Sequence, residues 1–208
     1  MVKVRAFRTL ENTFRRMGFH FVAGVDEVGR GCLAGPVVAA AVVLDPTRYV
    51  PRVCDSKTTT ALERERLYDK ITRSATCWAV ASAEPDEIDA INIHQASLRA
   101  MQRAVVGLCP CPDCVLVDAF RIPGLLMAQR AVPHGDARCT AIAAASIVAK
   151  VTRDRLMLVL HSRDPRYGFD RHKGYATREH LSAVARFGYS GVHRRSFRPP
   201  TLFDSMDQ

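Results

Sequence analysis

The sequence contains no hydrophobic run long enough to cross a membrane. Its longest strongly apolar run, residues 36–44, ends at Asp45-Pro46, whereas a bilayer-spanning helix needs about 20 apolar residues. The N-terminal region is rich in arginine, but Glu11 interrupts it, and it has neither the apolar stretch nor the small-residue cleavage site of a secretory signal. We therefore expect a cytoplasmic protein that does not interact with membranes.

The sequence also lacks the cysteine pattern of a disulfide framework. Its 7 cysteines are an odd number without a secretory signal, which favours reduced thiols. Cys109, Cys111 and Cys114 raise the alternative of a zinc-dependent interaction protein. Structural zinc needs four ligands, and no second Cys-x-x-Cys pair follows at finger-like spacing. We therefore favour a proline-rich loop that happens to hold thiols.

Internal repeats, low-complexity tracts and obvious linkers are absent too, which excludes repeat architectures and favours one domain over residues 1–208. What is present is positive charge: 30 Lys and Arg against 21 Asp and Glu give a formal net charge of +9, and basic residues crowd residues 163–198. Such a surface attracts a polyanion, although a basic face kept for solubility is the alternative.

Periodicity predicts alternating strands and helices. We expect strands at residues 21–25, 37–44, 77–82 and 114–117, the first two separated by a glycine-rich turn. Thr60 and Glu63 form a capping box that opens a helix to about residue 74. Further helices are expected at residues 86–108, at 140–160 and from Thr177 to about 187. The pattern predicts an α/β fold, a mixed central sheet flanked by helices, with a C-terminal helical portion from about residue 155 to 208.

Acidic residues follow two of the expected strands. Asp26-Glu27 ends the first strand, and Asp118 ends a later one. Asp136 lies in His134-Gly135-Asp136, just before the long helix. Acids at strand ends that meet on one sheet edge would form a metal pocket, although each acid alone could simply begin a turn.

Taken together, these segments resemble the ribonuclease HII family. The resemblance covers nearly everything from residue 20 to 200, in the family's order. The matching segments are residues 22–31 (VAGVDEVGRG), 34–37 (AGPV), 55–57 (DSK), 88–89 (ID), 92–93 (NI), 117–118 (VD), 135–136 (GD), 143–147 (AAASI), 149–151 (AKV), 153–154 (RD), 172–175 (HKGY), 193–194 (HR) and 196–197 (SF).

The resemblance implies a ribonuclease H-like fold and a catalytic, metal-binding site formed by Asp26, Glu27, Asp118 and Asp136. Carboxylates held close together repel one another, and magnesium or manganese, which prefer oxygen ligands, relieve that repulsion. The implied activity is a two-metal-ion hydrolysis of the RNA strand of RNA/DNA hybrids. It includes incision 5′ to single ribonucleotides in duplex DNA, and leaves 3′-hydroxyl and 5′-phosphate ends.

The resemblance also implies substrate contacts. A group must approach the 2′-hydroxyl closely, because that hydroxyl separates RNA from DNA. Gly29, Arg30, Gly31 and Tyr175 correspond to the elements with which the family senses the RNA-to-DNA junction. Lys57 and Asn92 are expected to contact the nucleic-acid backbone. Tyr175 as a turn anchor and Lys57 as a solvated loop cation are the structural alternatives, and Ser146 and Lys150, four apart on one helix, fit packing equally well.

Three positions depart from the family pattern. His134 stands where lysine is common, and Ala119 and Ala176 stand where glycine is frequent. A non-catalytic hybrid-binding module is the alternative function, but such a protein is expected to lose at least one carboxylate, and all of them are present. The C-terminal Thr201-Leu202-Phe203 could dock a sliding clamp, although a short apolar tail is commonly frayed. We expect a monomer.

Overall fold

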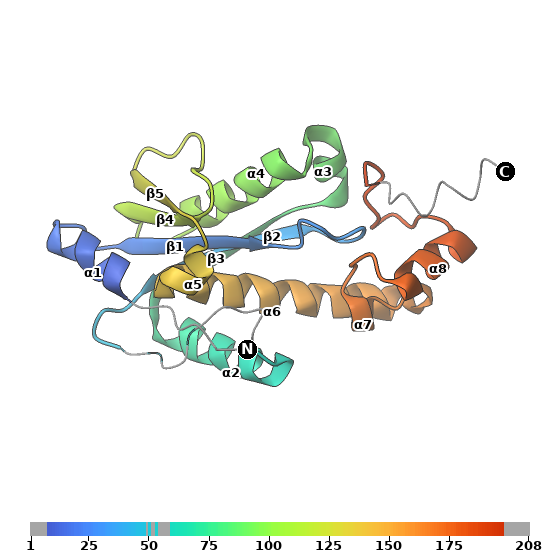
Figure 1. Ribbon diagram of the computed structural model, residues 1–208, viewed down its shortest axis with the longest axis horizontal. Coiled ribbons are helices and arrows are strands. Elements are labelled where there is room, and N and C mark those ends of the chain that lie inside the picture. Colours follow the sequence, from blue (N-terminus) through green and yellow to red (C-terminus); the bar gives the residue numbers. More distant parts are fainter. Residues whose placement is uncertain (1–7, 49, 51–52, 54–58, 198–208) are drawn as a thin grey trace.

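The computed structural model describes residues 8–48, 50, 53 and 59–197. Its centre is a five-stranded sheet in the order β3-β2-β1-β4-β5 (Figure 1). The strands are β1 (Val22–Val28), β2 (Val37–Leu44), β3 (Ala75–Ala83), β4 (Cys114–Asp118) and β5 (Ala128–Val132). β1, β2 and β3 form an antiparallel meander, whereas β1, β4 and β5 run parallel. The predicted mixed sheet is therefore confirmed.

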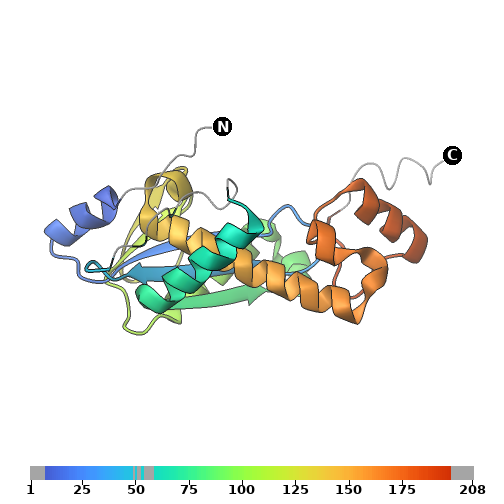
Figure 2. The same ribbon diagram turned by 90° about the horizontal axis from the view of Figure 1, so that it is seen from below.

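Helices cover both faces of this sheet. They are α1 (Thr9–Arg16), α2 (Ala61–Ser74), α3 (Pro85–Ile91), α4 (Ile93–Val106), α5 (Gly135–Arg138), α6 (Thr140–Arg163), α7 (Phe169–His172) and α8 (Arg178–Phe187), with a short 3-10 helix at Pro165–Tyr167. Figure 1 shows α6 along one face and α4 along the other, and Figure 2 shows α2 lying across α6. All eight residues of β2 are buried. Apolar side chains on both faces of β2 explain why its sequence is a continuous apolar run.

The first turn of the long helix α6 is hydrogen-bonded to a buried glutamate of α1. The backbone N–H of Ala141 donates to Glu11 Oε1 at 2.6 Å, and Glu11 is 1% exposed. Further along β1, a Cβ added at Gly24 would lie 2.1 Å from the Ala141 carbonyl carbon. Glycine at this point lets α6 touch the backbone of β1, which sets the distance between the helix and the strand that carries Asp26.

The predicted strands and helices are present, but α1, α5 and α7 were not predicted, and three further differences affect the description of the fold. The predicted helix over residues 86–108 is two helices, because Asn92 has a φ of 68° and breaks the helical backbone between α3 and α4. β5 was not predicted, since it is a partly exposed outer strand without a strong apolar alternation. β1 continues to Val28, so that Asp26 and Glu27 lie within the strand instead of after it.

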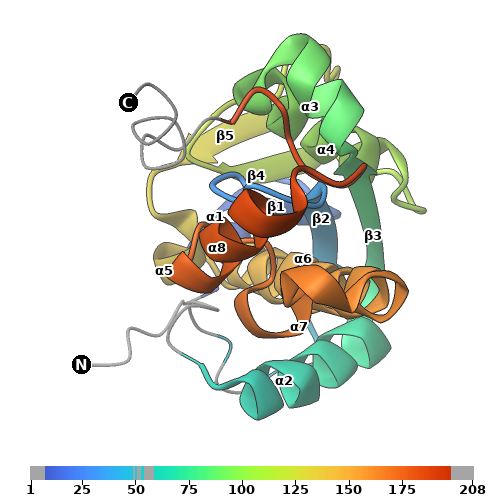
Figure 3. The same cartoon turned by 90° about the vertical axis from the view of Figure 1, so that its right-hand side faces the viewer.

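The C-terminal portion, residues 165–197, packs on the end of α6. Figure 3 shows α7 and α8 in front of the end of the sheet. Its apolar cluster is small and consists of Ala34, Met157, Tyr167, Phe169 and Val184. Within the described ranges, no helix is both long and apolar enough to cross a membrane.

Candidate active site

The parallel pairing of β1 with β4 brings two of the predicted acids together. Val25 lies opposite Val117, and Asp26 and Asp118 directly follow this pair on their strands. Asp26 is 6% exposed and Asp118 is partly buried. Two carboxylates that are distant in the sequence therefore lie side by side on adjacent strands, where the pairing of β1 with β4 ends.

Asp26 lies on the face of the sheet covered by α6. Its side chain is hydrogen-bonded to Ser146 of that helix, and its Oδ1 also accepts the Glu27 backbone N–H at 2.7 Å. Ser146 is thus a hydrogen-bond partner of a candidate catalytic acid, in addition to packing on α6.

Glu27 follows Asp26 and lies on the opposite face, because side chains alternate along a strand and Ala23 and Val25 pack on the α4 side. Its Oε1 accepts a hydrogen bond from Arg30 Nη1 at 3.1 Å. The Arg30 guanidinium in turn lies 5.7 Å from the ring centroid of Phe120. Arg30, a predicted substrate-contacting residue, is therefore already engaged with a candidate catalytic acid.

Asp118 connects to Asp136 through the start of α5. The Gly135 backbone N–H donates to Asp118 Oδ1 at 2.7 Å, and Asp136 is the next residue, 6% exposed. His134, which precedes them, has a φ of 54° and turns the chain toward Asp118. A Cβ at Gly135 would lie 2.5 Å from Ile142 and 3.2 Å from Asp118 Oδ1, so only glycine fits this connection closely.

The carboxylates disfavour one another's charge. Burial raises the pKa of Asp26 well above its ordinary value, and the nearby Glu27 and Asp118 carboxylates raise it further. Burial also raises the pKa of Glu27, although Arg30 opposes the rise. Both shifts mark an excess of negative charge in a poorly solvated place, which a cation would relieve.

The donor chemistry suits a hard divalent cation, since carboxylate oxygens are the ligands that magnesium and manganese prefer. The present side-chain arrangement is not a metal cage: across the described residues, no group of three or more His, Cys, Asp or Glu is gathered closely enough to hold an ion. Asp26 Oδ1, Glu27 Oε1 and Asp118 Oδ1 already accept hydrogen bonds from protein donors. These acids therefore fit a metal by charge and ligand type, and metal binding requires the side chains to reorient.

The predicted Gly-Arg-Gly element forms a loop held by buried arginines. The Arg194 guanidinium donates to the carbonyls of Gly29 at 2.6 Å, Arg30 at 2.9 Å and Gly35 at 3.0 Å. Gly29 has a φ of 93°, and a Cβ there would lie 2.2 Å from Arg153 Nε. Gly31 is exposed, and a Cβ there would meet nothing within 4 Å. Glycine is thus sterically required at position 29 and not at position 31.

Tyr175 lies beside this loop. It forms an isolated β-bridge with Cys32, and its side chain is 41% exposed. The Lys150 Nζ lies 5.8 Å from the centre of its ring, and Lys150 also pairs with Asp154 at 2.7 Å. The ring of Tyr175 is therefore available at the surface next to a lysine.

The other predicted substrate residues are more scattered. Asn92 caps α4, where its side-chain oxygen accepts the Gln95 backbone N–H at 3.1 Å. Lys57 lies outside the described residues. Ala119 has a φ of 59°, a left-handed conformation consistent with the glycine that is frequent there, whereas Ala176 is an exposed residue.

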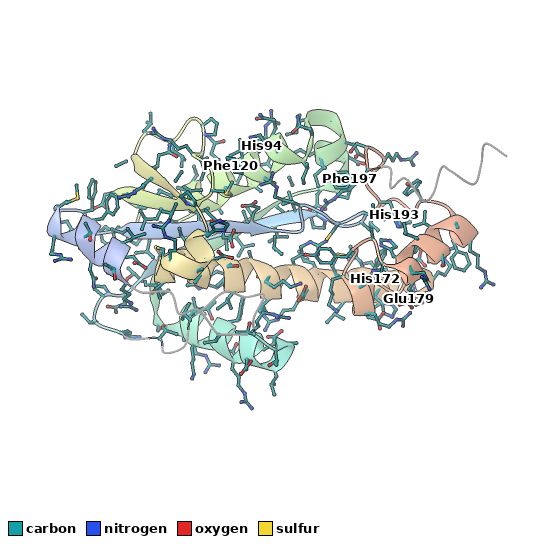
Figure 4. All side chains as sticks on the ribbon, in the orientation of Figure 1. His94, Phe120, His172, Glu179, His193 and Phe197 are labelled. Carbon is teal, nitrogen blue, oxygen red and sulfur yellow. The ribbon has the colours of Figure 1, made fainter. Side chains whose placement is uncertain are left out.

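The sequence did not predict the roles of the residues that hold the Gly-Arg-Gly loop or of the aromatic residue next to Arg30. Arg153 and Arg194 are fully buried, and Arg153 donates to the carbonyls of Pro36, Lys173 and Ala34. Phe120 is 44% exposed and packs edge-on against His94, with ring centroids 5.2 Å apart (Figure 4). The only available signal was the presence of these arginines in the matched segments, because charged residues are ordinarily expected at the surface.

Comparison with known proteins identifies the family. A family model described as Ribonuclease HII matches residues 23–199. The chain is 54% identical over 181 residues to the Ribonuclease HII of Cupriavidus necator, covering 86% of this chain and 76% of that protein. It is 48% identical over 205 residues to the Ribonuclease HII of Burkholderia ambifaria, covering 96% and 94%.

Solved structures give the same result for the fold. The ribonuclease H2 from Pyrococcus horikoshii OT3 superposes with a TM-score of 0.73 at 27% identity, covering 88% of this chain and 95% of that chain. The PCNA:RNase HII complex from Archaeoglobus fulgidus gives 0.68 at 25% identity, covering 84% and 92%. The fold is thus that of an α/β nuclease of the ribonuclease H type. This chain belongs to the ribonuclease HII family, metal-dependent nucleases that act on RNA/DNA hybrids.

Proposed function

We propose that this protein is an endoribonuclease that cleaves RNA/DNA hybrids and also incises duplex DNA 5′ to a single ribonucleotide, leaving 3′-hydroxyl and 5′-phosphate ends. The observation that carries the proposal is that Asp26 and Asp118 lie next to each other on adjacent parallel strands, where the pairing of β1 with β4 ends, with Glu27 beside them. Family membership supplies the substrate class, and the acids supply the chemistry.

Asp26, Glu27, Asp118 and Asp136 would hold the divalent cations, magnesium or manganese. Two such ions supply Lewis-acid activation of water and stabilisation of the leaving 3′ oxygen. The protein's own contribution is to hold carboxylates in a partly buried place where they disfavour one another's charge, so that bound cations would stabilise their ionised form. Ser146 and the Gly135 N–H orient Asp26 and Asp118 through the hydrogen bonds described above.

Gly29, Arg30 and Gly31 would read the ribose at the cleavage site, and Tyr175 would stack on the neighbouring deoxyribose. Arg194 supports this role because it binds the Gly29 and Arg30 carbonyls from the interior, which fixes the loop backbone without using its outer surface. Lys57 and Asn92 would contact phosphates, and the C-terminal portion from about residue 155 would extend the substrate surface.

Three further expectations stay predictions of the sequence: a monomer, a cytoplasmic location, and a clamp contact through Thr201-Leu202-Phe203. That tail lies outside the described residues. The relative from Archaeoglobus fulgidus is known in a complex with PCNA, which supports a test of clamp binding for this chain.

The direct test is incubation with magnesium and three matched duplexes: all DNA, DNA with one ribonucleotide, and an RNA/DNA hybrid. We expect incision of the hybrid, and a single cut 5′ to the lone ribonucleotide, with no cut in the DNA duplex. A folded sample that cleaves the hybrid and spares the lone ribonucleotide would reject the proposed specificity and leave the family's hybrid activity intact.

A further inference from the structure

Buried histidines lie behind Tyr175 in the C-terminal portion. His180 and His193 are 0% and 2% exposed, and Figure 4 shows His193 at the end of the molecule where α7 and α8 lie. Among the residues that the structure describes, no carboxylate is hydrogen-bonded to either ring. Since a buried polar ring costs stability unless it is hydrogen-bonded, the partners of these two rings decide what they do.

The hydrogen bonds of the pair have only one consistent direction. The Ser190 backbone N–H can only donate, and it lies 3.0 Å from His193 Nδ1, so this nitrogen is the acceptor. The Ser190 hydroxyl, 2.8 Å from the same nitrogen, can take either role and so fits this assignment. The Tyr175 carbonyl can only accept, and it lies 2.9 Å from His180 Nδ1, so this nitrogen carries the proton. The two Nε2 atoms are 3.0 Å apart. In neutral rings, His193 Nε2 then holds a proton and His180 Nε2 a lone pair, and the two match.

We propose that His180 and His193 are positioning residues for Tyr175, through a one-way chain of hydrogen bonds from Ser190 through His193 and His180 to the Tyr175 carbonyl. The inference rests on the proposed substrate contact of Tyr175 and deepens it. The chain ties α8 and the loop around His193 to the backbone of a residue whose ring is at the surface. It thereby sets where that ring meets the substrate.

A second proton on His180 would break the chain, because it would face the His193 Nε2 proton. A second proton on His193 Nδ1 would face the Ser190 N–H, so the Ser190 hydroxyl, 2.8 Å away, would have to accept it. The surroundings keep the rings neutral: burial lowers the pKa of both to about 4, His172 disfavours charge on both, and His180 disfavours charge on His193. His172 stacks on His180 with centroids 4.4 Å apart and opposes its charge, whereas Asp164 favours charge on His193. His172 itself faces Glu179, Arg171 and Asp170.

The alternative is that the histidines merely fill the small core around Tyr167 and Phe169, whose rings lie 4.8 and 5.7 Å from that of His193. Packing and positioning predict different results for two substitutions. His193→Leu fills the same space with an apolar side chain and removes the hydrogen-bond donor. His193→Gln removes the ring and keeps an amide N–H that can reach His180 Nε2. Positioning predicts that the Gln variant is the better enzyme, whereas packing predicts no such preference.

The experiment is a kinetic double-mutant cycle on a duplex with one ribonucleotide. We expect His193→Leu to raise KM about fivefold with little change in kcat, the scale of one lost hydrogen bond. His193→Gln should restore most of the loss, and His193→Leu should add nothing in a Tyr175→Ala background. His161→Leu is the matched control, since His161 pairs with Asp170 outside the chain.

The outcomes separate the two proposals. If Tyr175→Ala leaves cleavage unchanged, the substrate contact of Tyr175 is wrong, and the positioning role falls with it. If Tyr175→Ala impairs cleavage but the His193→Leu penalty persists undiminished in that background, only the positioning role is wrong.

Nitrogen-15 NMR of the wild-type imidazoles at pH 7 gives a readout that does not depend on activity or on variant folding. We expect the proton on Nδ1 of His180 and on Nε2 of His193. The opposite tautomer of either ring, or a charged ring, would overturn the proposed direction.

Discussion

The sheet and the C-terminal portion of this protein are held together by different forces. β2 is buried along its whole length between two layers of helices, and its contacts are apolar. The C-terminal portion has a small apolar cluster, and its largest buried side chains include Arg194. Apolar contacts are nondirectional, whereas hydrogen bonds fix atoms relative to one another. The polar arrangement occurs around the Gly29 loop and Tyr175, the residues proposed above to contact the substrate.

The largest effect is expected at the acidic edge of the sheet. Asp118→Asn should lower kcat about a thousandfold, because losing a metal ligand removes several kcal/mol of transition-state stabilisation. Binding to an uncleaved duplex should change little, since phosphate contacts dominate affinity. Asp69→Asn, at an exposed position of α2, is the control. Parallel loss of binding and cleavage would argue that Asp118 holds the fold instead of the metal.

Breaking the polar arrangement should cost stability. Arg194→Met removes the donors to three carbonyls, and leaving them buried without partners is expected to lower the free energy of unfolding by about 4 kcal/mol. Urea denaturation measures the change. Val184→Ala, in the apolar cluster of the same portion, should cost less, about 2 kcal/mol. Equal costs would erase the contrast between the two kinds of contact.

Acid should weaken the C-terminal portion selectively. The pKa of His180 and of His193 is lowered by burial to about 4 in the folded state, below the ordinary value of 6.5. Because the pKa is lower in the folded state, the contribution of the neutral rings to the free energy of unfolding is fully present above pH 6.5 and is lost as the pH falls toward 4. We expect a loss of about 3 kcal/mol between pH 7 and pH 5. Urea denaturation at a series of pH values measures the free energy of unfolding. In a His193→Gln variant this free energy should depend less steeply on pH, and an unchanged pH dependence would contradict the assignment.

Two neighbouring glycines sharpen the account of the loop. Gly29→Ala should lower the free energy of unfolding by about 2 kcal/mol, because φ is positive and the new Cβ would collide with Arg153. Gly31→Ala should be nearly neutral in thermal unfolding, since that position is open. If Gly31→Ala nevertheless impairs cleavage, the effect arises from the substrate, which supports close approach of the loop to the ribose.

The smallest effect is expected at the cysteines that raised the zinc alternative. Cys109 and Cys111 are exposed, whereas Cys114 is buried in β4, where burial raises its pKa to about 11 and disfavours the thiolate that zinc requires. Changing Cys109 and Cys111 to Ser should alter the free energy of unfolding by less than about 0.5 kcal/mol. Elemental analysis of protein purified without chelators should find no stoichiometric zinc, and stoichiometric zinc would revive the alternative.

Several features were readable in the sequence because their causes are local. Thr60 and Glu63 form the predicted capping box, with both reciprocal hydrogen bonds present. Two short apolar runs, the second with β-branched residues, predicted β1 and β2, and the ordered segments predicted the family. The break at Asn92 was missed because asparagine adopts both helical and left-handed backbone conformations, so its presence does not indicate a helix end. β5 was missed because it is a partly exposed outer strand.

The sequence by itself determined the identity of the acids, the alternation of strands and helices, and the family. Only the tertiary structure decided that Asp26 and Asp118 are neighbours, which follows from strand pairing, and that Arg153 and Arg194 are interior residues. The physical reason is that a buried charge is tolerated only where partners from distant parts of the chain converge on it. The direction of the histidine chain has the same origin, because it is set by what lies at its two ends.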